Sequence, residues 1–324
     1  MTQECYIGVD LGATNLKAGA VTAGACVLAR TSVQTQAHRG ADFIVDNICR
    51  TIEAVREAAG VERQDVAGVG IGSPGTLDIK AGMVHFVPNM PLWCNVPVVR
   101  EVSSRTGYRA VLENDANAAA YGEFWVGAGR GVVSMVMLTL GTGIGGGIIA
   151  NGRLVHGDTD CAGELGHMII EAGGVKCACG NNGCLEAYAS ANSLARRFAE
   201  AVNAGGDSTL ARAVRSGRPV DAKAVCEAAL AGDPLANRIF NETALYLGVG
   251  IVNILHIINP ARVVIAGGLI NAGDLLMRPI RQTVRNRALP DSYRRCDIVF
   301  ASLGEDAGFI GGAGCALVAF GTSQ

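Results

Sequence analysis

Charged and aromatic side chains are scarce in this chain of 324 residues: Asp, Glu, Lys and Arg make up 17% of it, and Phe, Trp and Tyr only 5%. The charges nearly cancel, with 27 basic and 29 acidic residues and a formal net charge of −2. Proteins that bind nucleic acid or anionic membranes carry an excess of basic charge. The balance here gives no electrostatic reason to expect either partner.

Long apolar runs are missing as well. No stretch approaches the roughly 18 uninterrupted apolar residues of a membrane span, and the opening residues MTQECYIGVD lack the basic region and apolar core of a signal peptide. The 11 cysteines are an odd and irregularly spaced set, which does not suit a disulfide framework. We therefore expect a cytoplasmic protein with free or metal-bound thiols.

Glycine, at 44 residues, is abundant, and short β-prone runs alternate with segments of helical periodicity. Strands are predicted at 5–11, 15–21, 26–33, 66–71, 111–113, 132–140, 144–150 and 263–266. Helices are predicted at 44–59, after residue 115, from Asp233-Pro234 to about residue 258, and after Gly267-Gly268. With about 150 residues per domain, this alternation predicts an α/β protein of two domains.

A faint internal repeat supports two related domains. The string LGAT at 11–14 and the string LGTG at 140–143 each lie between two strand-like runs. Such a pair predicts two similar α/β domains facing a cleft, although any two glycine-rich hairpins look somewhat alike. No Pro/Ser-rich linker separates the halves, so crossing chain segments would form the hinge.

A cysteine-rich string is the strongest chemical signal. His167 is followed by Cys177, Cys179 and Cys184, the last three within CACGNNGC. Three thiolates and one imidazole fill a tetrahedral Zn²⁺ site, so the metal would be structural. Gly180 and other glycines of the string permit the tight turns that gather the thiolates. A loop of free thiols is the alternative.

Two glycine-containing hairpins could present backbone N–H groups to phosphates. They span residues 10–15 (DLGATN) and 141–147 (GTGIGGG). Neither continues as a Walker A loop, and the second joins two strands instead of preceding a helix, which argues against a dinucleotide fingerprint. Tight hairpins without a ligand are the alternative.

Asn114 and Asp115 stand where a predicted strand meets a predicted helix. A carboxylate there could accept a hydroxyl proton as a general base. It could equally cap the helix, and the pattern leaves both interpretations open.

Further polar residues could bind a ligand rich in hydroxyl groups. Glu164 precedes His167 in GELGH, and Glu186 follows the cysteine string. If the zinc loop folds back on His167, the two carboxylates approach each other and can accept hydrogen bonds from hydroxyls. Asn89, in the string PNMPLW, could be donor and acceptor in a binding loop. A solvated surface position is the alternative for each residue.

Taken together, these strings resemble the ROK family of repressors, open reading frames and sugar kinases, over about residues 6–319. The most specific parts are GELGH at 163–167 and CACGNNGCLE at 177–186. The other matching strings follow in order: DLGATNLK at 10–17, SPGTLD at 73–78, ENDAN at 113–117 and LGTGIGGG at 140–147. Within the family, the chain is most similar to bacterial glucokinases.

The resemblance implies an actin-like ATPase (ribonuclease-H-like) fold of two α/β domains around a cleft. The first would comprise residues 1–113 with 303–324, and the second residues 114–302, carrying the zinc loop 167–184. The implied activity is transfer of the γ-phosphate of ATP, with Mg²⁺, to the 6-hydroxyl of a hexose. A homodimer is also implied.

The resemblance gives each candidate residue a role. Asp115 would accept the O6 proton. The sugar would be held by Asn89, Asn114, Asp115, Glu164, His167 and Glu186. The nucleotide site would comprise Asp10, Gly12, Thr14, Asn15, Lys17, Gly141, Thr142, Gly143, Gly267 and Gly268, with Asp10 on Mg²⁺ and the last two glycines near the adenosine. His167 would bind zinc with Cys177, Cys179 and Cys184, and its second ring nitrogen would face the sugar.

One departure and several alternatives remain. Ala13 stands where many relatives carry a second glycine, and its methyl group would loosen ATP binding slightly. Glucose is the expected substrate, but mannose, fructose, allose and N-acetylated hexosamines differ by one hydroxyl or its substituent. Polyphosphate as donor is likewise open. A repressor would need DNA-binding helices, for which there is no room before Cys5, and a non-catalytic sugar sensor would not need Asp115 and two phosphate hairpins.

Overall fold

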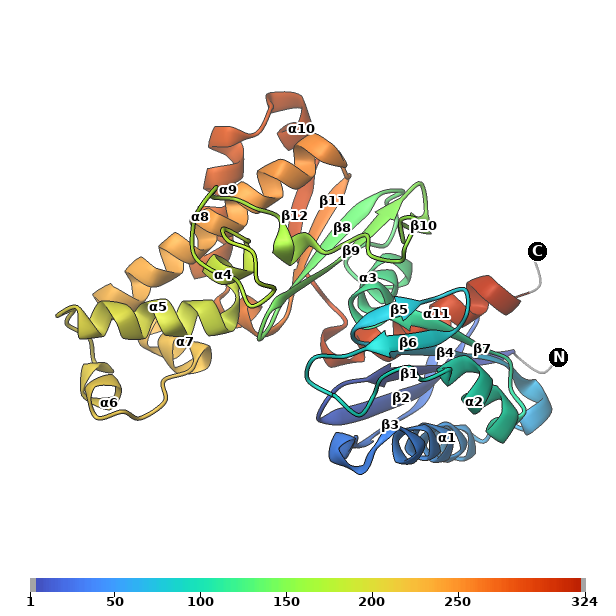
Figure 1. Ribbon diagram of the computed structural model, residues 1–324. Coiled ribbons are helices and arrows are strands. Elements are labelled where there is room, and N and C mark those ends of the chain that lie inside the picture. Colours follow the sequence, from blue (N-terminus) through green and yellow to red (C-terminus); the bar gives the residue numbers. More distant parts are fainter. Residues whose placement is uncertain (1–3, 322–324) are drawn as a thin grey trace. The chain divides into compact units, whose positions relative to one another are not determined.

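The computed structural model describes residues 4–321, and the chain divides into two compact units (Figure 1). Unit 1 contains the residues up to Gly131, Gly147–Gly163 and the residues from Ser302 onward. Unit 2 contains Val132–Gly146 and Glu164–Ala301. The chain therefore passes between the units four times, without a separate linker segment.

The unit boundaries differ from those expected from the sequence. Residues 114–131 and 147–163, expected in the second domain, belong to unit 1. For residues 114–131, the physical reason is the close packing of α3 (Asp115–Trp125) against α11 (Ala307–Phe320). A Cβ atom at Gly311 would lie only 1.6 Å from the carbonyl oxygen of Ala118, so glycine lets these two helices touch along their backbones.

The sheet of unit 1 has the strand order β3-β2-β1-β4-β7. Its strands are β1 (Cys5–Leu11), β2 (Asn15–Thr22), β3 (Val27–Gln34), β4 (Val66–Ser73) and β7 (Ala110–Asn114). The first three are antiparallel neighbours, whereas β4 and β7 run parallel to β1. Parallel strands end at one edge of a sheet, and in register Asp10 pairs with Gly72, and Ser73 with Asn114.

Each face of this sheet has its own core. Ile7 and Val9 belong to the cluster formed with α1 (Ala41–Ala58) and α2 (Val98–Thr106). Tyr6 belongs to the opposite cluster, with Phe309 of α11. This is the two-residue alternation of a strand buried on both faces. A small hairpin, β5 (Thr76–Asp78) and β6 (Met83–Phe86), completes the unit, and β4 ends at Ser73 beneath buried Trp93, whose Nε1 donates to Ser73 Oγ.

The second sheet has the order β10-β9-β8-β11-β12. Its strands are β8 (Met135–Leu140), β9 (Ile144–Ala150), β10 (Arg153–Leu154), β11 (Arg262–Ala266) and β12 (Asp297–Phe300). Strand β11 is parallel to β8 and β12. The order matches that of the first sheet element by element, which confirms the internal repeat predicted from the two glycine hairpins.

Unit 2 carries several helices beside its strands. They are α4 (Glu186–Ala189), α5 (Ala191–Asn203), α6 (Ala211–Arg215), α7 (Ala222–Leu230), α8 (Pro234–Ile257), α9 (Asp274–Arg287) and α10 (Pro290–Arg294). The long helix α8 begins and ends close to its predicted limits, with the Asp233 side chain as N-cap. Among the described residues, no helix combines the length and apolar character that crossing a bilayer requires.

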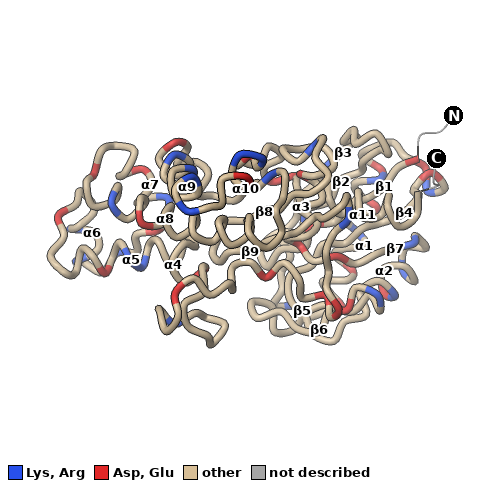
Figure 2. The backbone as a smooth tube through the Cα atoms, turned by 90° about the horizontal axis from the view of Figure 1, so that it is seen from above, with Lys and Arg blue, Asp and Glu red and all other residues tan. Residues whose placement is uncertain are grey.

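Acidic and basic positions are interspersed along the elements of both units (Figure 2). On α2, for example, Arg105 contacts Glu101 of its own helix and Asp42 and Asp46 of α1. Basic side chains such as Arg105 therefore lie among carboxylates of their own and neighbouring helices.

Candidate active site

Strand β7 ends at Asn114, and α3 begins at Asp115, so the candidate base lies at a helix N-terminus. The side chain of Asn114 is the N-cap: its Oδ1 accepts hydrogen bonds from the N–H groups of Ala116 at 3.0 Å and Asn117 at 3.2 Å. Asp115 Oδ1 also accepts from Ala116, at 2.8 Å. The capping role that the sequence left open for Asp115 thus belongs to Asn114.

Asp10 lies near the end of β1, at the same sheet edge as Asn114. Burial and the Asp115 carboxylate raise the pKa of Asp10 to about 6, while Lys17 opposes the rise. Gly308 makes room for this carboxylate, because a Cβ there would lie 2.5 Å from Asp10 Cγ. Two carboxylates that disfavour each other's charge fit a hard divalent cation such as Mg²⁺. The Lys17 ammonium also pairs with Glu305, at 2.9 Å.

The first predicted phosphate hairpin joins β1 to β2. Gly12 N–H donates to the Asn15 carbonyl at 2.9 Å, and the Thr35 hydroxyl donates to the Gly12 carbonyl at 2.6 Å. Thr14 and Asn15 are exposed at its tip. Thr35 therefore fixes the backbone of the hairpin at Gly12, while the tip of the hairpin is exposed to solvent.

The second hairpin joins β8 to β9 within unit 2. Gly141 N–H donates to the Gly143 carbonyl at 3.0 Å, and Gly141 and Thr142 are exposed. Both residues also line a cavity of about 540 Å³ together with Gly268. Its other walls come from α5, α7 and the turn after β11: Ala191, Asn192, Ala195, Ala222, Lys223, Cys226, Glu227, Leu230, Leu269 and Asn271. Gly267, which precedes Gly268, packs against the backbone of β8: a Cβ there would lie 2.3 Å from the Leu140 carbonyl oxygen.

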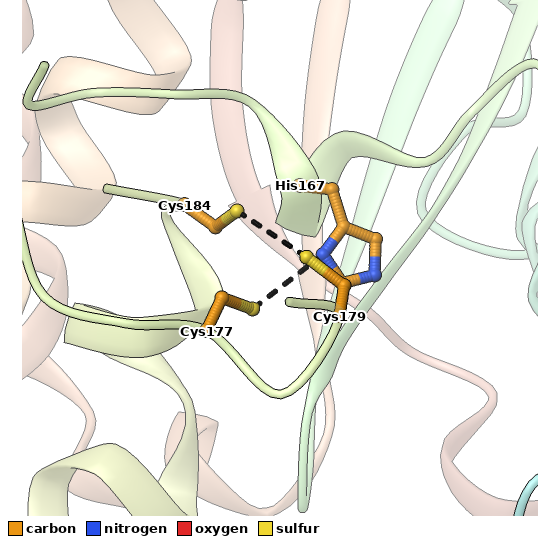
Figure 3. Close-up of side chains that lie close together, drawn as sticks. All are labelled: His167, Cys177, Cys179 and Cys184. Carbon is orange, nitrogen blue, oxygen red and sulfur yellow. Dashed lines mark hydrogen bonds between the residues drawn. The ribbon is translucent and has the colours of Figure 1, made fainter. Parts of the chain in front are cut away.

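The four predicted zinc ligands converge in unit 2 (Figure 3). One ligand atom from each of His167, Cys177, Cys179 and Cys184 lies within 4.8 Å of all the others. The Cys179 and Cys184 sulfurs are 3.7 Å apart, and Cys177 Sγ is 3.8 Å from His167 Nδ1. Ligands at tetrahedral Zn²⁺ are separated by about 3.6–3.8 Å, given bonds of about 2.0–2.3 Å. The donor set and its spacing fit zinc.

The loop makes the tight turns around this cluster that its glycines were expected to permit. Gly180 and Gly183 have φ of 94° and 81°, a region that favours glycine. His167 directs Nδ1 toward the sulfurs, while its Nε2 lies 3.8 Å from Glu164 Oε2. Glu186 Oε1 lies 3.7 Å from Cys177 Sγ. Glu164 and Glu186 therefore both flank the cluster, as expected if the loop folds back on His167.

The predicted sugar-binding residues fall into two sets. Asn114 and Asp115 lie together in unit 1, which also carries Asn89 on an exposed turn after β6. Glu164, His167 and Glu186 belong to unit 2.

Two contacts were not predicted. Glu113, almost fully buried, places Oε2 2.7 Å from His156 Nε2 and accepts from Asn114 N–H and Asn117 Nδ2 through Oε1. The hydrogen bond that Glu113 accepts, opposed by burial, raises the pKa of His156. Glu113 could have been suspected from its place beside Asn114, whereas nothing local distinguishes His156. The second contact joins Glu186 to the N–H of Ile144.

Two similarly ordered sheets, each with a glycine hairpin after its first strand, together with an acidic helix N-terminus and a Cys₃His cluster, define a sugar kinase of the actin-like ATPase fold. The ROK family model matches residues 6–318, and the chain belongs to the ROK family. Glucokinases from Halalkalibacterium halodurans and Thermotoga maritima are 37% and 39% identical to it, over 96% and 95% of this chain and 94% and 95% of theirs.

Solved structures agree. A ROK family glucokinase from Streptomyces griseus, in complex with glucose and AMPPNP, is 36% identical, with a TM-score of 0.79 over 96% of this chain and 98% of that one. A ROK hexokinase from Thermus thermophilus is 32% identical, with a TM-score of 0.81 over 97% of this chain and 99% of that one. A xylose repressor from Caldicellulosiruptor bescii is 30% identical over 76% of this chain and 61% of its own length. The chain is an enzyme of the glucokinase type.

Proposed function

We propose that this chain transfers the γ-phosphate of ATP to the 6-hydroxyl of glucose, with Asp115 as the general base. The observation that carries the proposal is the carboxylate of Asp115 at the start of α3, beside Asp10 and next to a cap that another residue supplies. The glucose assignment is supported by the glucokinase relatives and by the glucose-bound neighbour.

The chain's own residues would act mainly by holding and orienting the reactants. Phosphoryl transfer has a loose transition state with charge on the equatorial oxygens, so positioning and charge stabilisation dominate. The N–H groups of Gly12–Thr14 and Gly141–Gly143 would hold the phosphates, with Asn15 and Lys17 beside the first hairpin. The cavity at Gly268 would receive the adenosine.

The sugar would be oriented by hydrogen bonds. Asn114 uses Oδ1 for the helix cap, so its amide nitrogen would donate to a sugar oxygen. Glu164, Glu186 and His167 Nε2 would contact hydroxyls, and Asn89 would do so from its turn. Asp115 would then take the O6 proton as O6 attacks the γ-phosphorus.

Two metal ions belong to this proposal. Asp10 would hold Mg²⁺, which when bound would neutralise charge on the phosphates. The Cys₃His set leaves no open coordination position, so Zn²⁺ would stabilise the loop that carries Glu186. We expect a cytoplasmic location. We also expect a homodimer, which light scattering of the purified chain would test.

ADP release from Mg-ATP should be measured with a panel of hexoses that includes mannose, fructose, allose, N-acetylglucosamine and N-acetylmannosamine. We expect the highest kcat/KM with glucose. A higher value for another sugar would replace glucose and keep the mechanism. Absence of turnover with every sugar, with ATP and with polyphosphate, would contradict the kinase and favour a sugar sensor or repressor.

A further inference from the structure

A side chain that closely follows the zinc loop contacts the predicted nucleotide hairpin of unit 2. The N–H of Ile144, directly after the hairpin, donates to Oε2 of Glu186 at 2.8 Å. Glu186 is the first residue of α4 and follows closely after the zinc-ligand candidate Cys184. A residue expected to bind sugar therefore also contacts the backbone that would bind phosphates.

The Glu186 carboxylate also lies close to the backbone at position 143. A Cβ atom on Gly143 would lie 2.3 Å from Glu186 Oε2 and 3.1 Å from its Cδ. Gly143 does not have a positive φ, so backbone conformation does not require glycine here. A side chain at position 143 would instead meet the end of the Glu186 side chain, so its carboxylate would have to move.

The backbone around Glu186 is fixed from both sides. Leu185 N–H donates to the Met168 carbonyl at 2.9 Å, and the Ser193 hydroxyl donates to the Glu186 carbonyl at 2.7 Å. Ala191 N–H donates to the carbonyl of Gly141 at 2.9 Å, which is a second attachment of the same segment to the hairpin. The Glu186 carboxylate therefore extends from a backbone segment that hydrogen bonds fix on both sides. Its own hydrogen bond to Ile144 can then hold the hairpin in place.

We propose that Glu186 is a positioning residue for nucleotide binding as well as a sugar ligand: Oε2 fixes the hairpin at Ile144 while Oε1 serves the sugar side. This inference rests on the proposed function, because it takes the hairpin to be the nucleotide site. A charged acceptor holds an N–H more strongly than a neutral one, so the hairpin's phosphate-binding shape would depend on Glu186 even when no sugar is bound.

ADP binding without sugar provides the test, measured by isothermal titration calorimetry with Mg²⁺. A residue that only binds sugar would leave this Kd unchanged. We expect Glu186→Ala to weaken ADP binding about tenfold, the usual effect of losing a charged hydrogen bond, and Glu186→Gln to weaken it less because an amide oxygen can still accept. Glu164→Gln is the matched control: it removes another carboxylate beside the zinc cluster, should raise the KM for glucose, and should leave the ADP Kd within about twofold of wild type.

The contact at Gly143 supplies an independent readout. Gly143→Ala should weaken ADP binding in the wild-type background, because its methyl group displaces Glu186, and should have a smaller effect in the Glu186→Ala background. We expect the two effects to differ by at least about threefold, as for residues in contact. Melting temperature and zinc content of each variant, the latter by elemental analysis, establish that the fold and the metal loop are kept.

Three results are distinguishable. Unchanged ADP affinity in Glu186→Ala, or equal effects of Gly143→Ala in both backgrounds, would overturn the inference while wild-type kinase activity still stood. A wild-type chain that binds no ADP would overturn the inference and the proposed function together. Weakened ADP binding with the predicted coupling would support both.

Discussion

Oε2 of Glu113 lies 2.7 Å from Nε2 of His156. Glu113 directly precedes Asn114 and Asp115 in the chain. The hydrogen bond with Glu113, opposed by burial, raises the pKa of His156 above the ordinary value of a histidine, and Asp160 contributes in the same direction. Burial and, to a lesser extent, the Glu113 charge raise the pKa of the Cys315 thiol on α11. The pair therefore connects the segment that carries Asn114 and Asp115 with the segment that carries His156.

The Glu113–His156 pair should make stability depend on pH. Because the folded state raises the pKa of His156, its contribution is complete below the unfolded pKa of about 6.5 and is lost as pH rises through the folded pKa. His156→Gln keeps a hydrogen-bond donor but not the charge. We expect the melting temperature of wild type to exceed that of the variant at pH 6 and the gap to shrink by pH 9. Exposed His85→Gln is the control, and a gap constant with pH would contradict the prediction.

Asp115→Ala should abolish transfer while glucose still binds. General-base loss costs about 10²–10⁴-fold in turnover. Because Asn114 caps α3, the fold should remain, with a melting temperature close to wild type. Asn114→Ala provides the contrast, because loss of an N-cap costs about 1 kcal/mol. Turnover in Asp115→Ala above a tenth of the wild-type rate would rule out the general-base role.

Cys179→Ser should lose zinc and glucose affinity together. Removing one of four ligands opens the loop that carries Glu186, so the KM for glucose should rise at least about tenfold. The matched control is Cys94→Ser, an exposed cysteine outside the cluster. Elemental analysis and calorimetry with glucose provide the two measurements. A variant without zinc that binds glucose normally would contradict the structural role of the metal.

Asp233 should protect α8 against acid. Burial alone would raise its pKa, but hydrogen bonds from Ala236 N–H, Ser208 and Thr209 lower it to about 2, from 3.8. A lowered folded pKa gives stability that is present above about pH 4 and is lost as pH falls toward 2. Asp233→Ala should therefore cost about 1 kcal/mol at pH 7, and urea unfolding should show the cost shrinking below pH 4. An undiminished difference at pH 3 would count against this assignment.

Much of the fold was predictable from local patterns. The limits of β1 and β9 agree with the prediction, and α8 ends within a residue or two of its predicted limits. These elements combine continuous apolar runs with clear stop signals. Helix α7 was not predicted, because it is built largely from alanine and has no broad stripe of large apolar residues. Its packing against α8, with Ala228 and Ala229 buried, defines it instead.

The sequence by itself determined the Cys₃His cluster and the acidic helix start, because these residues lie in short strings whose spacing already restricts their geometry. The tertiary structure alone decided that α3 belongs to unit 1, that His156 pairs with Glu113, and that Glu186 accepts a hydrogen bond from the N–H of Ile144. The last two pairs are separated by 43 and 42 residues in the chain. Contacts at such separations depend on how strands and helices pack, and no local pattern of residue types encodes them.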